Sequence, residues 1–210
     1  MHMQNSLLQW PHERILEEAR ALRVGYQLKR TLRFNTQRDL TVHSESVGEH
    51  EFGLFYLLEY FLPLEDPEGL LDFRTLYRII LFHDFPEIAH GDVPYLHKTA
   101  AHIARENAAA AGVFASLPES IRKSAQKSWE MYERRDKPEA QFAYALDKVE
   151  PMFELFDPIN EQTPKRINQT YESHLGKKLK ATENYPYMRK FVEVVSEDML
   201  RRGVFWKEQK

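Results

Sequence analysis

Apolar residues recur at three- and four-residue intervals along most of this chain, which is the spacing of one buried helix face. Glycine is scarce, at 8 of 210 residues, and the Asn-Gly and Asp-Gly pairs that mark tight hairpins do not occur. We therefore predict an all-α fold. An early helix is predicted over 15–28, where the apolar positions are Ile15, Ala19, Leu22 and Tyr26.

The segment Ser46-Val47-Gly48-Glu49 has the pattern of a capping box. In such a box the Ser46 hydroxyl accepts from the backbone N–H of Glu49, and the Glu49 carboxylate accepts from the backbone N–H of Ser46. The predicted helix starts there and stops at Leu62, because Pro63 lacks the backbone donor that a helix needs.

Asp72 is predicted to cap a further helix, which reaches His83-Asp84 and meets Pro86. The proline marks a local distortion immediately after the two polar residues. Further helices are predicted over 99–115, 118–134, 141–156 (with a kink at Pro151) and 187–206, with helical patches in 157–186 and an ordered polar loop over 30–45.

The composition excludes several classes of site. The chain has no cysteine, so disulfides, thiolate metal sites and cysteine nucleophiles are ruled out. Lys and Arg number 29 and Asp and Glu 32, a balance that gives no electrostatic footprint for nucleic acid. The apolar runs are too short for a membrane span, and Met1 to Trp10 does not resemble a signal peptide. We expect a cytoplasmic protein that binds neither nucleic acid nor a membrane.

His83-Asp84 follows an apolar helical stretch, where an unpaired carboxylate would cost several kcal/mol if desolvated. The aspartate therefore needs a cation, a strong donor or water. A metal shared by these neighbours requires further ligands from other helices. His50, one turn beyond the capping box, and Asp147, inside the apolar run 142–149, are candidates. Two His and two Asp suit one divalent transition metal, and softness alone does not choose among Mn, Co, Fe, Ni and Zn.

This order of residues resembles the H…HD…D pattern of the HD superfamily of metal-dependent phosphohydrolases, and most closely its YfbR-like 5′-deoxynucleotidases. The segment 45–50, Glu-Ser-Val-Gly-Glu-His, is similar to the block before that group's first ligand. A second block follows the form HDxxExxxGDxP at all six fixed positions, namely His83, Asp84, Glu87, Gly91, Asp92 and Pro94.

The resemblance implies a single helical HD domain over 1–210, with a core over about 30–156 and a helical extension over 157–210. It implies that His50, His83, Asp84 and Asp147 are the metal ligands. It further implies general acid/base work for Glu87 and a contact of Asp92 with the sugar side of a nucleotide.

Arg33-Phe34 resembles the Arg-Trp pair that the family uses near its substrate, with Phe in place of Trp. An arginine can bind phosphate oxygens with its planar fork, and an aromatic ring can stack on a base. Arg38 is a second candidate in this loop. Lys148 is expected either near the phosphate or pointing to solvent.

The resemblance favours hydrolysis of deoxyribonucleoside 5′-monophosphates by a homodimer. Alternatives within the fold are hydrolysis of a triphosphate, of guanosine tetraphosphate or of a phosphodiester. A regulatory HD module that binds metal or nucleotide without turnover, and an all-helical interaction protein, are alternatives of a different class. His90, His97 and His102 fit no second metal site and are predicted to be surface or structural residues.

Overall fold

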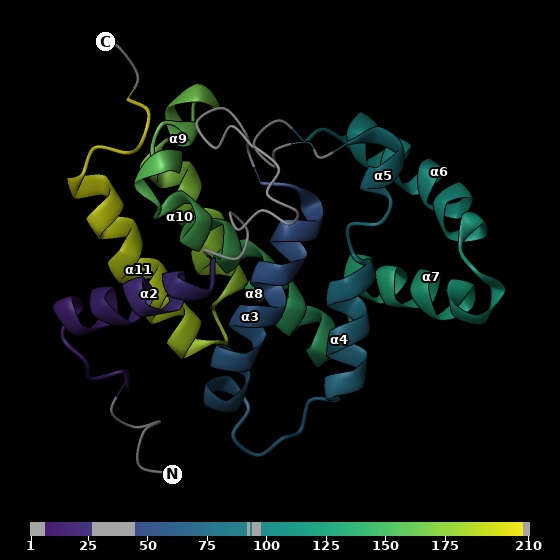
Figure 1. The fold of residues 1–210 in the computed structure, drawn as a ribbon, viewed down its shortest axis with the longest axis horizontal. Coiled ribbons are helices and arrows are strands. Elements are labelled where there is room, and N and C mark those ends of the chain that lie inside the picture. The colour runs from purple at the N-terminus through teal and green to yellow at the C-terminus, as the bar shows by residue number, and fades with distance from the viewer. Residues whose placement is uncertain (1–6, 27–44, 92, 94–97, 208–210) are drawn as a thin grey trace, which may run out of the picture. The chain divides into compact units, whose positions relative to one another are not determined.

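The computed structural model describes residues 7–26, 45–91, 93 and 98–207, and no strand is present among them (Figure 1). The all-α prediction is confirmed. The helices of eight or more residues are α2 (His12–Tyr26), α3 (Val47–Glu65), α4 (Phe73–Phe82), α6 (Ala100–Ser116), α7 (Glu119–Arg134), α8 (Pro138–Leu155), α10 (Tyr171–Ala181) and α11 (Pro186–Arg201); the shorter ones are α5 (Glu87–His90), η3 (Pro158–Asn160) and α9 (Thr163–Arg166).

The chain forms two compact units. Unit 1 comprises Met1–Pro67 and Ala145–Lys210, and unit 2 comprises Glu68–Tyr144. The boundary falls within α8, so this helix contributes its first residues to unit 2 and the rest to unit 1.

Aromatic residues form the centre of unit 1, where α11 contacts α2, α3 and α10. The Phe191 ring of α11 meets the Phe61 ring of α3 edge-on, with centroids 5.3 Å apart. Phe153 of α8 lies 6.1 Å from the same ring, and all three side chains are fully buried. Edge-to-face packing of this kind adds to the stabilisation that burial gives.

The predicted capping box at the start of α3 is confirmed. The Ser46 side chain accepts from the Glu49 backbone N–H at 3.3 Å, and the Glu49 carboxylate accepts from the Ser46 backbone N–H at 2.8 Å. The predicted end at Leu62 is wrong, because α3 continues through Pro63 to Glu65. Proline removes only its own donor here, and the helix is completed by the Asp66 N–H, which bonds to the Leu62 carbonyl at 2.9 Å.

In unit 2, α4 packs against α7, while α6 contacts both α5 and α7. The predicted cap is confirmed, since the Asp72 carboxylate accepts from the backbone N–H groups of Arg74 and Thr75. Buried residues of α4, α6 and α7 form the core of this unit, with Leu81, Phe85, Leu117 and Trp129 packed around them: Phe82, Ala110, Phe114 and Ala125.

The distortion predicted at Pro86 is confirmed, and it separates His83 from Glu87. Helix α4 ends at Phe82, and residues 83–86 form turns before Glu87 opens α5. Pro86 has no N–H to donate to the Phe82 carbonyl, so the α-helical hydrogen-bond pattern stops and the backbone forms tighter turns. The Phe85 N–H points to that carbonyl instead, at 3.4 Å, and the Glu87 N–H bonds to the Asp84 carbonyl at 2.9 Å.

Helix α11 also ends earlier than predicted, at Arg201 rather than Trp206. Gly203 adopts a left-handed φ of 72°, which glycine takes without steric cost. Its N–H bonds to the Leu200 carbonyl at 3.0 Å, and the Val204 N–H bonds to the Met199 carbonyl at 3.2 Å. These two bonds form a Schellman motif, which terminates the helix.

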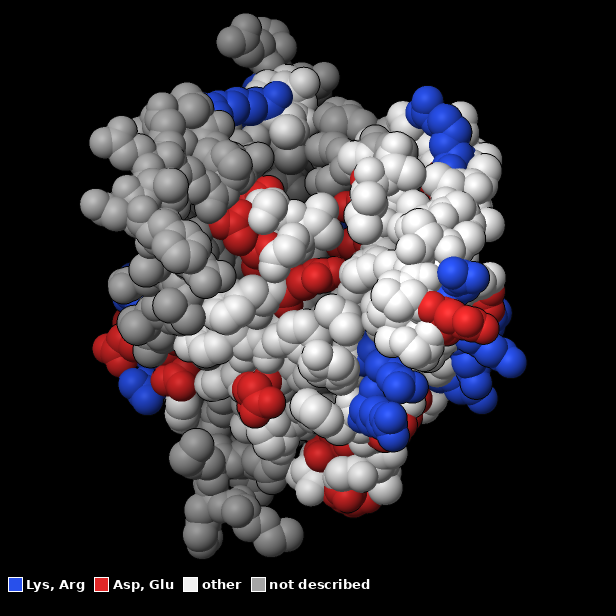
Figure 2. Space-filling view, turned by 45° about the vertical axis from the view of Figure 1, so that its right-hand side comes forward, with Lys and Arg blue, Asp and Glu red and all other residues white. Residues whose placement is uncertain are grey.

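Among the described residues, no helix combines the length and the apolar composition that crossing a bilayer requires. In the face drawn in Figure 2, basic and acidic side chains are interspersed among uncharged ones.

The capping box generates a first prediction. Replacing Ser46 with Ala should lower the free energy of unfolding by about 1 kcal/mol, because a backbone donor at the start of α3 loses its acceptor. Urea-induced unfolding measures the change, and Ser46→Asp, which keeps an acceptor, should retain most of the stability. Equal loss in both variants would contradict a capping role.

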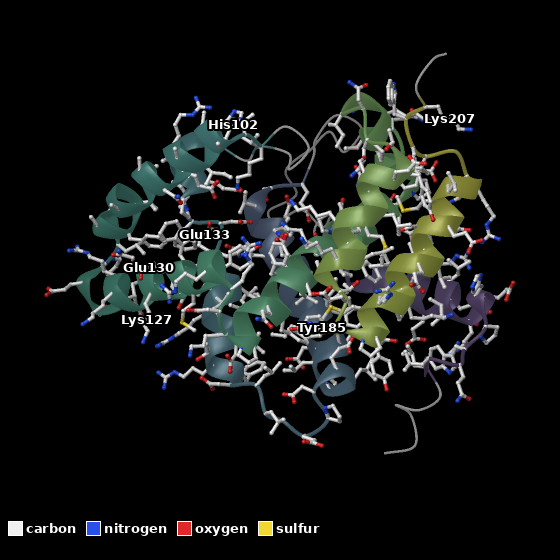
Figure 3. All side chains as sticks on the ribbon, turned by 180° about the vertical axis from the view of Figure 1, so that it is seen from behind. His102, Lys127, Glu130, Glu133, Tyr185 and Lys207 are labelled. Carbon is white, nitrogen blue, oxygen red and sulfur yellow. The ribbon has the colours of Figure 1, made fainter. Side chains whose placement is uncertain are left out.

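A second prediction concerns Glu65, which ends α3 and accepts from the Met188 N–H in the first turn of α11 at 2.8 Å. Burial raises the pKa of Glu65 from 4.5 to about 7, against the lowering effect of the Met188 and Tyr187 N–H groups. The Tyr185 side chain, labelled near the start of α11 in Figure 3, has its pKa raised to about 12 by burial and by the Glu65 charge.

The folded form of Glu65 therefore binds its proton more tightly than the unfolded form. The stability from this group is fully present below pH 4.5 and is lost as the pH rises through about 7. Glu65→Gln should remove that loss, so its stability relative to wild type should rise by roughly 1 to 2 kcal/mol between pH 4.5 and 7.5. Thermal unfolding across this pH range tests the point, and parallel profiles would refute it.

Candidate metal centre

In unit 1, His50 is held by a buried carboxylate. His50 lies one turn into α3, and its Nδ1 is 2.7 Å from Oε2 of Glu150 on α8. Glu150 is fully buried. An ionised carboxylate only accepts hydrogen bonds, so this contact favours the tautomer of His50 that carries its proton on Nδ1. In the neutral ring, this leaves the lone pair on Nε2.

The Nε2 of His50 faces Asp147, with its Oδ1 atom 3.3 Å away. Asp147 lies one turn before Glu150 on α8, so the two carboxylates share a helix face. Lys148 forms an ion pair with Asp147, and its proximity to a substrate phosphate stays a prediction. The structure thus brings His50 and Asp147 together, as expected from the sequence.

A buried lysine lies behind this group. Lys178 of α10 is 4% exposed, and its Nζ donates to the backbone carbonyl of Lys148. Burial and the Lys148 charge lower the pKa of Lys178 and the charges of Asp147 and Glu150 raise it, so that its pKa is about 7. Near neutral pH this lysine is therefore only partly protonated, in a buried layer that also holds the carboxylates of Asp147 and Glu150.

In unit 2, His83 is held in the same way by a different acceptor. Its Nδ1 is 2.8 Å from the backbone carbonyl of Ile80, which can only accept, so the nitrogen carries the proton. Its Nε2 is 3.2 Å from Oδ2 of Asp84. The ring is 2% exposed and lies 4.8 Å from the Tyr132 ring.

Both histidines therefore present Nε2 to an aspartate oxygen. A lone-pair nitrogen and a carboxylate oxygen at 3.2–3.3 Å repel each other unless a proton or another cation lies between them. A neutral imidazole whose other nitrogen is tied to an acceptor is the usual form of a metal-ligating histidine. In each unit separately, an imidazole nitrogen beside a carboxylate oxygen is a pair of donors that suits a divalent transition metal.

Sequence reasoning did not single out two acidic residues of unit 1. Glu45, His50 and Glu150 offer ligand atoms within 4.8 Å of one another, an arrangement that could hold a cation. Glu150 interrupts an apolar run just as Asp147 does, so the argument applied to Asp147 would have identified it.

Glu87 is half-buried at the start of α5. Its charge acts on Lys98, which forms a 2.6 Å ion pair with the buried Glu106. Burial lowers the pKa of Lys98, but the bond to Glu106 and the charges of Glu106, Glu87 and Glu133 raise it overall. Glu87 therefore lies in a region that also contains a compensating cation.

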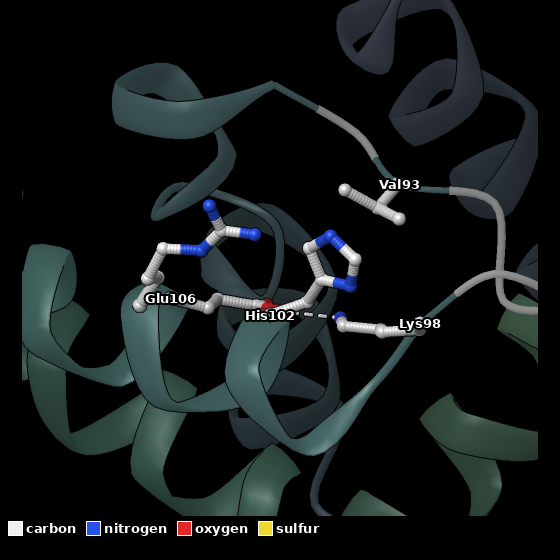
Figure 4. Close-up of a pocket in the computed structure, with 5 residues that line it drawn as sticks. Val93, Lys98, His102 and Glu106 are labelled. Atoms are coloured by element: carbon white, nitrogen blue, oxygen red, sulfur yellow. Dashed lines mark ion pairs between the residues drawn. The ribbon is translucent and has the colours of Figure 1, made fainter.

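A cavity of about 240 Å³ lies beside this ion pair in unit 2. Figure 4 shows Lys98 and Glu106 joined across it, with Val93 and His102 on its wall and Arg105 completing the lining. His102 caps α6, since its Nδ1 accepts from the Thr99 N–H at 3.1 Å. This confirms the structural role predicted for that histidine.

Several predicted site residues lie outside the described part of the chain. They are Arg33, Phe34, Arg38 and Asp92, together with the His97 residue and the His90 side chain. Gly91 is described and closes α5 at a φ of 76°, with its N–H 2.7 Å from the Glu87 carbonyl.

Comparisons with known proteins agree with the motifs. A family model described as HD domain matches residues 26–189. The chain is 29% identical to 5′-deoxynucleotidase HDDC2 of Homo sapiens over 180 residues, covering 84% of this chain and 81% of the human protein. The same protein of Mus musculus is 29% identical over 162 residues, covering 75% and 78%.

A solved structure is also similar. It is a predicted metal-dependent phosphohydrolase from Magnetospirillum magnetotacticum MS-1, with a TM-score of 0.64 and 27% identity. The match covers 91% of this chain and 98% of that one. The family model spans well over half of the sequence and reaches beyond the predicted core of 30–156. The chain belongs to the HD-domain family, as its motifs predicted.

Proposed function

We propose that this protein is a metal-dependent phosphohydrolase in which His50, His83, Asp84 and Asp147 hold one divalent transition-metal ion. The observation that carries the proposal is the matching state of the two histidines, each with Nδ1 bound to an acceptor and Nε2 facing an aspartate. Membership of the HD-domain family and the similarity to a phosphohydrolase structure support it. The ion is one of Mn, Co, Fe, Ni or Zn.

A bound divalent ion would supply Lewis-acid polarisation of a phosphate ester. Glu87 is the group we assign to proton transfer, because its carboxylate is half-buried and begins the helix that follows His83-Asp84. It would take a proton from the attacking water and return one to the leaving oxygen. Lys98 offsets part of the negative charge around Glu87.

We further propose deoxyribonucleoside 5′-monophosphates as the substrates. The names of the human and mouse relatives support this choice. In this proposal Arg33 binds phosphate oxygens, Phe34 packs against the base or sugar, and Asp92 contacts the sugar. The products are inorganic phosphate and a deoxyribonucleoside.

A third prediction tests the metal ligands. Asp84→Ala should abolish stoichiometric metal binding, because it removes one ligand and leaves the Nε2 of His83 without its neighbouring carboxylate. Metal content after dialysis against Mn²⁺, Co²⁺ or Zn²⁺ measures this. Asp136→Ala, an exposed aspartate of unit 2 paired with Arg134, is the matched control and should bind as wild type does. Undiminished metal content in Asp84→Ala would exclude the four-ligand site.

A fourth prediction tests catalysis. Wild-type protein loaded with Mn²⁺, Co²⁺ or Zn²⁺ should release phosphate from deoxyribonucleoside 5′-monophosphates faster than from triphosphates, guanosine tetraphosphate or a phosphodiester. Glu87→Gln should keep the metal but lose about 10²- to 10⁴-fold in kcat, since it removes the acid/base group.

The control for this experiment is Glu119→Gln, which changes an exposed glutamate in the first turn of α7. It should retain full activity. Absence of phosphate release from every nucleotide by metal-loaded wild-type protein would refute the enzyme proposal.

A further inference from the structure

We propose that Glu150 is a positioning residue that fixes His50 with its proton on Nδ1, so that Nε2 is the nitrogen that binds the metal. The inference rests on the proposed metal site and deepens it. Glu150 itself is assigned no contact with the ion.

The geometry singles out Glu150 for this task. Its Oε2 lies 2.7 Å from the His50 Nδ1, while the Nε2 on the opposite side of the ring lies 3.3 Å from the Oδ1 of Asp147. Because Glu150 and Asp147 are one turn apart on α8, a single rigid helix approaches both nitrogens of the same imidazole. The ring can neither flip nor tilt without breaking a contact with this helix.

A purely structural role would not need a carboxylate at this position. Glu150 is fully buried, and its neighbours Val149, Met152 and Phe153 on α8 are apolar and buried too. Burying an ionised carboxylate costs several kcal/mol unless donors and positive charge compensate it. The His50 Nδ1–H supplies the donor, and the buried Lys178, whose Nζ bonds to the Lys148 carbonyl, places a basic group in the same layer.

The carboxylate also decides the tautomer. A neutral imidazole with Nε2 protonated would direct an N–H toward Asp147 and could not bind a metal through that atom. An acceptor at Nδ1 selects the opposite tautomer and makes the ring a stronger ligand. In His83 the acceptor at Nδ1 is the backbone carbonyl of Ile80, which no side-chain substitution can remove. His50 therefore offers the better test of this effect.

The experiment compares wild type with Glu150→Gln, whose amide can donate to Nδ1 as well as accept. We expect the affinity for Zn²⁺, measured by competition with a chelating dye, to fall about 10- to 100-fold. The matched control is Glu154→Gln, which changes the next buried glutamate of α8, bonded to Asn160 at 2.6 Å. This control should bind Zn²⁺ as wild type does.

The second readout is ¹⁵N NMR of histidine-labelled, metal-free protein at a pH where the imidazoles are neutral, with His50→Asn used to identify the His50 signals. Wild type should show His50 protonated on Nδ1, and Glu150→Gln should shift its population toward protonation on Nε2. The wild-type spectrum tests the inference even if the variant fails to fold.

Three outcomes would overturn the positioning role. They are a wild-type His50 protonated on Nε2, unchanged Zn²⁺ affinity in Glu150→Gln, and weakened binding with the wild-type tautomer retained. The last would make Glu150 a direct ligand. In each case wild-type protein would still bind metal and release phosphate. If wild type did neither, the proposed function itself would fail, so the two failures are distinguishable.

Discussion

The proposed metal site depends on one interaction, the hydrogen bond from a histidine Nδ1 to a group that can only accept. In unit 1 the acceptor is the buried carboxylate of Glu150, and in unit 2 it is the Ile80 carbonyl. Each bond determines which nitrogen carries the proton and turns the other toward an aspartate. In unit 1 the capping box of α3 and the apolar packing of α8 position the residues of this bond. In unit 2 the core of α4, α6 and α7 packs next to His83.

The break after Phe82 has a functional consequence. A continuous helix would have placed His83 and Glu87 one above the other on a single face. Instead, Pro86 divides the segment into the end of α4, a turn and the short helix α5. The pair His83-Asp84 thus lies in a turn whose backbone is tied by the Glu87 N–H to the Asp84 carbonyl, so the proposed ligand and the proposed acid/base residue are directly connected.

Much of this could be predicted from the sequence, because helical periodicity and caps are local signals. Ser46 and Asp72 were identified as caps from their own and the next few residues, and the HD-type motif identified the family. The ends of helices were less predictable. Pro63 is tolerated because only the last bonds of α3 follow it, and Gly203 ends α11 by adopting a positive φ that sequence alone does not reveal.

The partners of the site were predictable only in part. Glu150 contacts His50, which is 100 residues away in the sequence. Lys178 contacts the carbonyl of Lys148, which is 30 residues away. No local sequence pattern predicts such pairs. The motif indicated the proposed ligands, and the structure adds the residues that contact His50 and Lys148. The roles of Arg33, Phe34 and Asp92 continue to rest on the resemblance, since these residues lie outside the described ranges.

The central claim is that two imidazole Nε2 atoms and two carboxylates bind one ion. X-ray absorption spectroscopy of the protein loaded with one equivalent of Co²⁺ or Zn²⁺ tests it most directly. The account predicts scattering from two histidine rings together with oxygen ligands, reduced to one ring in either His50→Asn or His83→Asn. A spectrum that shows only oxygen ligands, or that neither substitution changes, would contradict it.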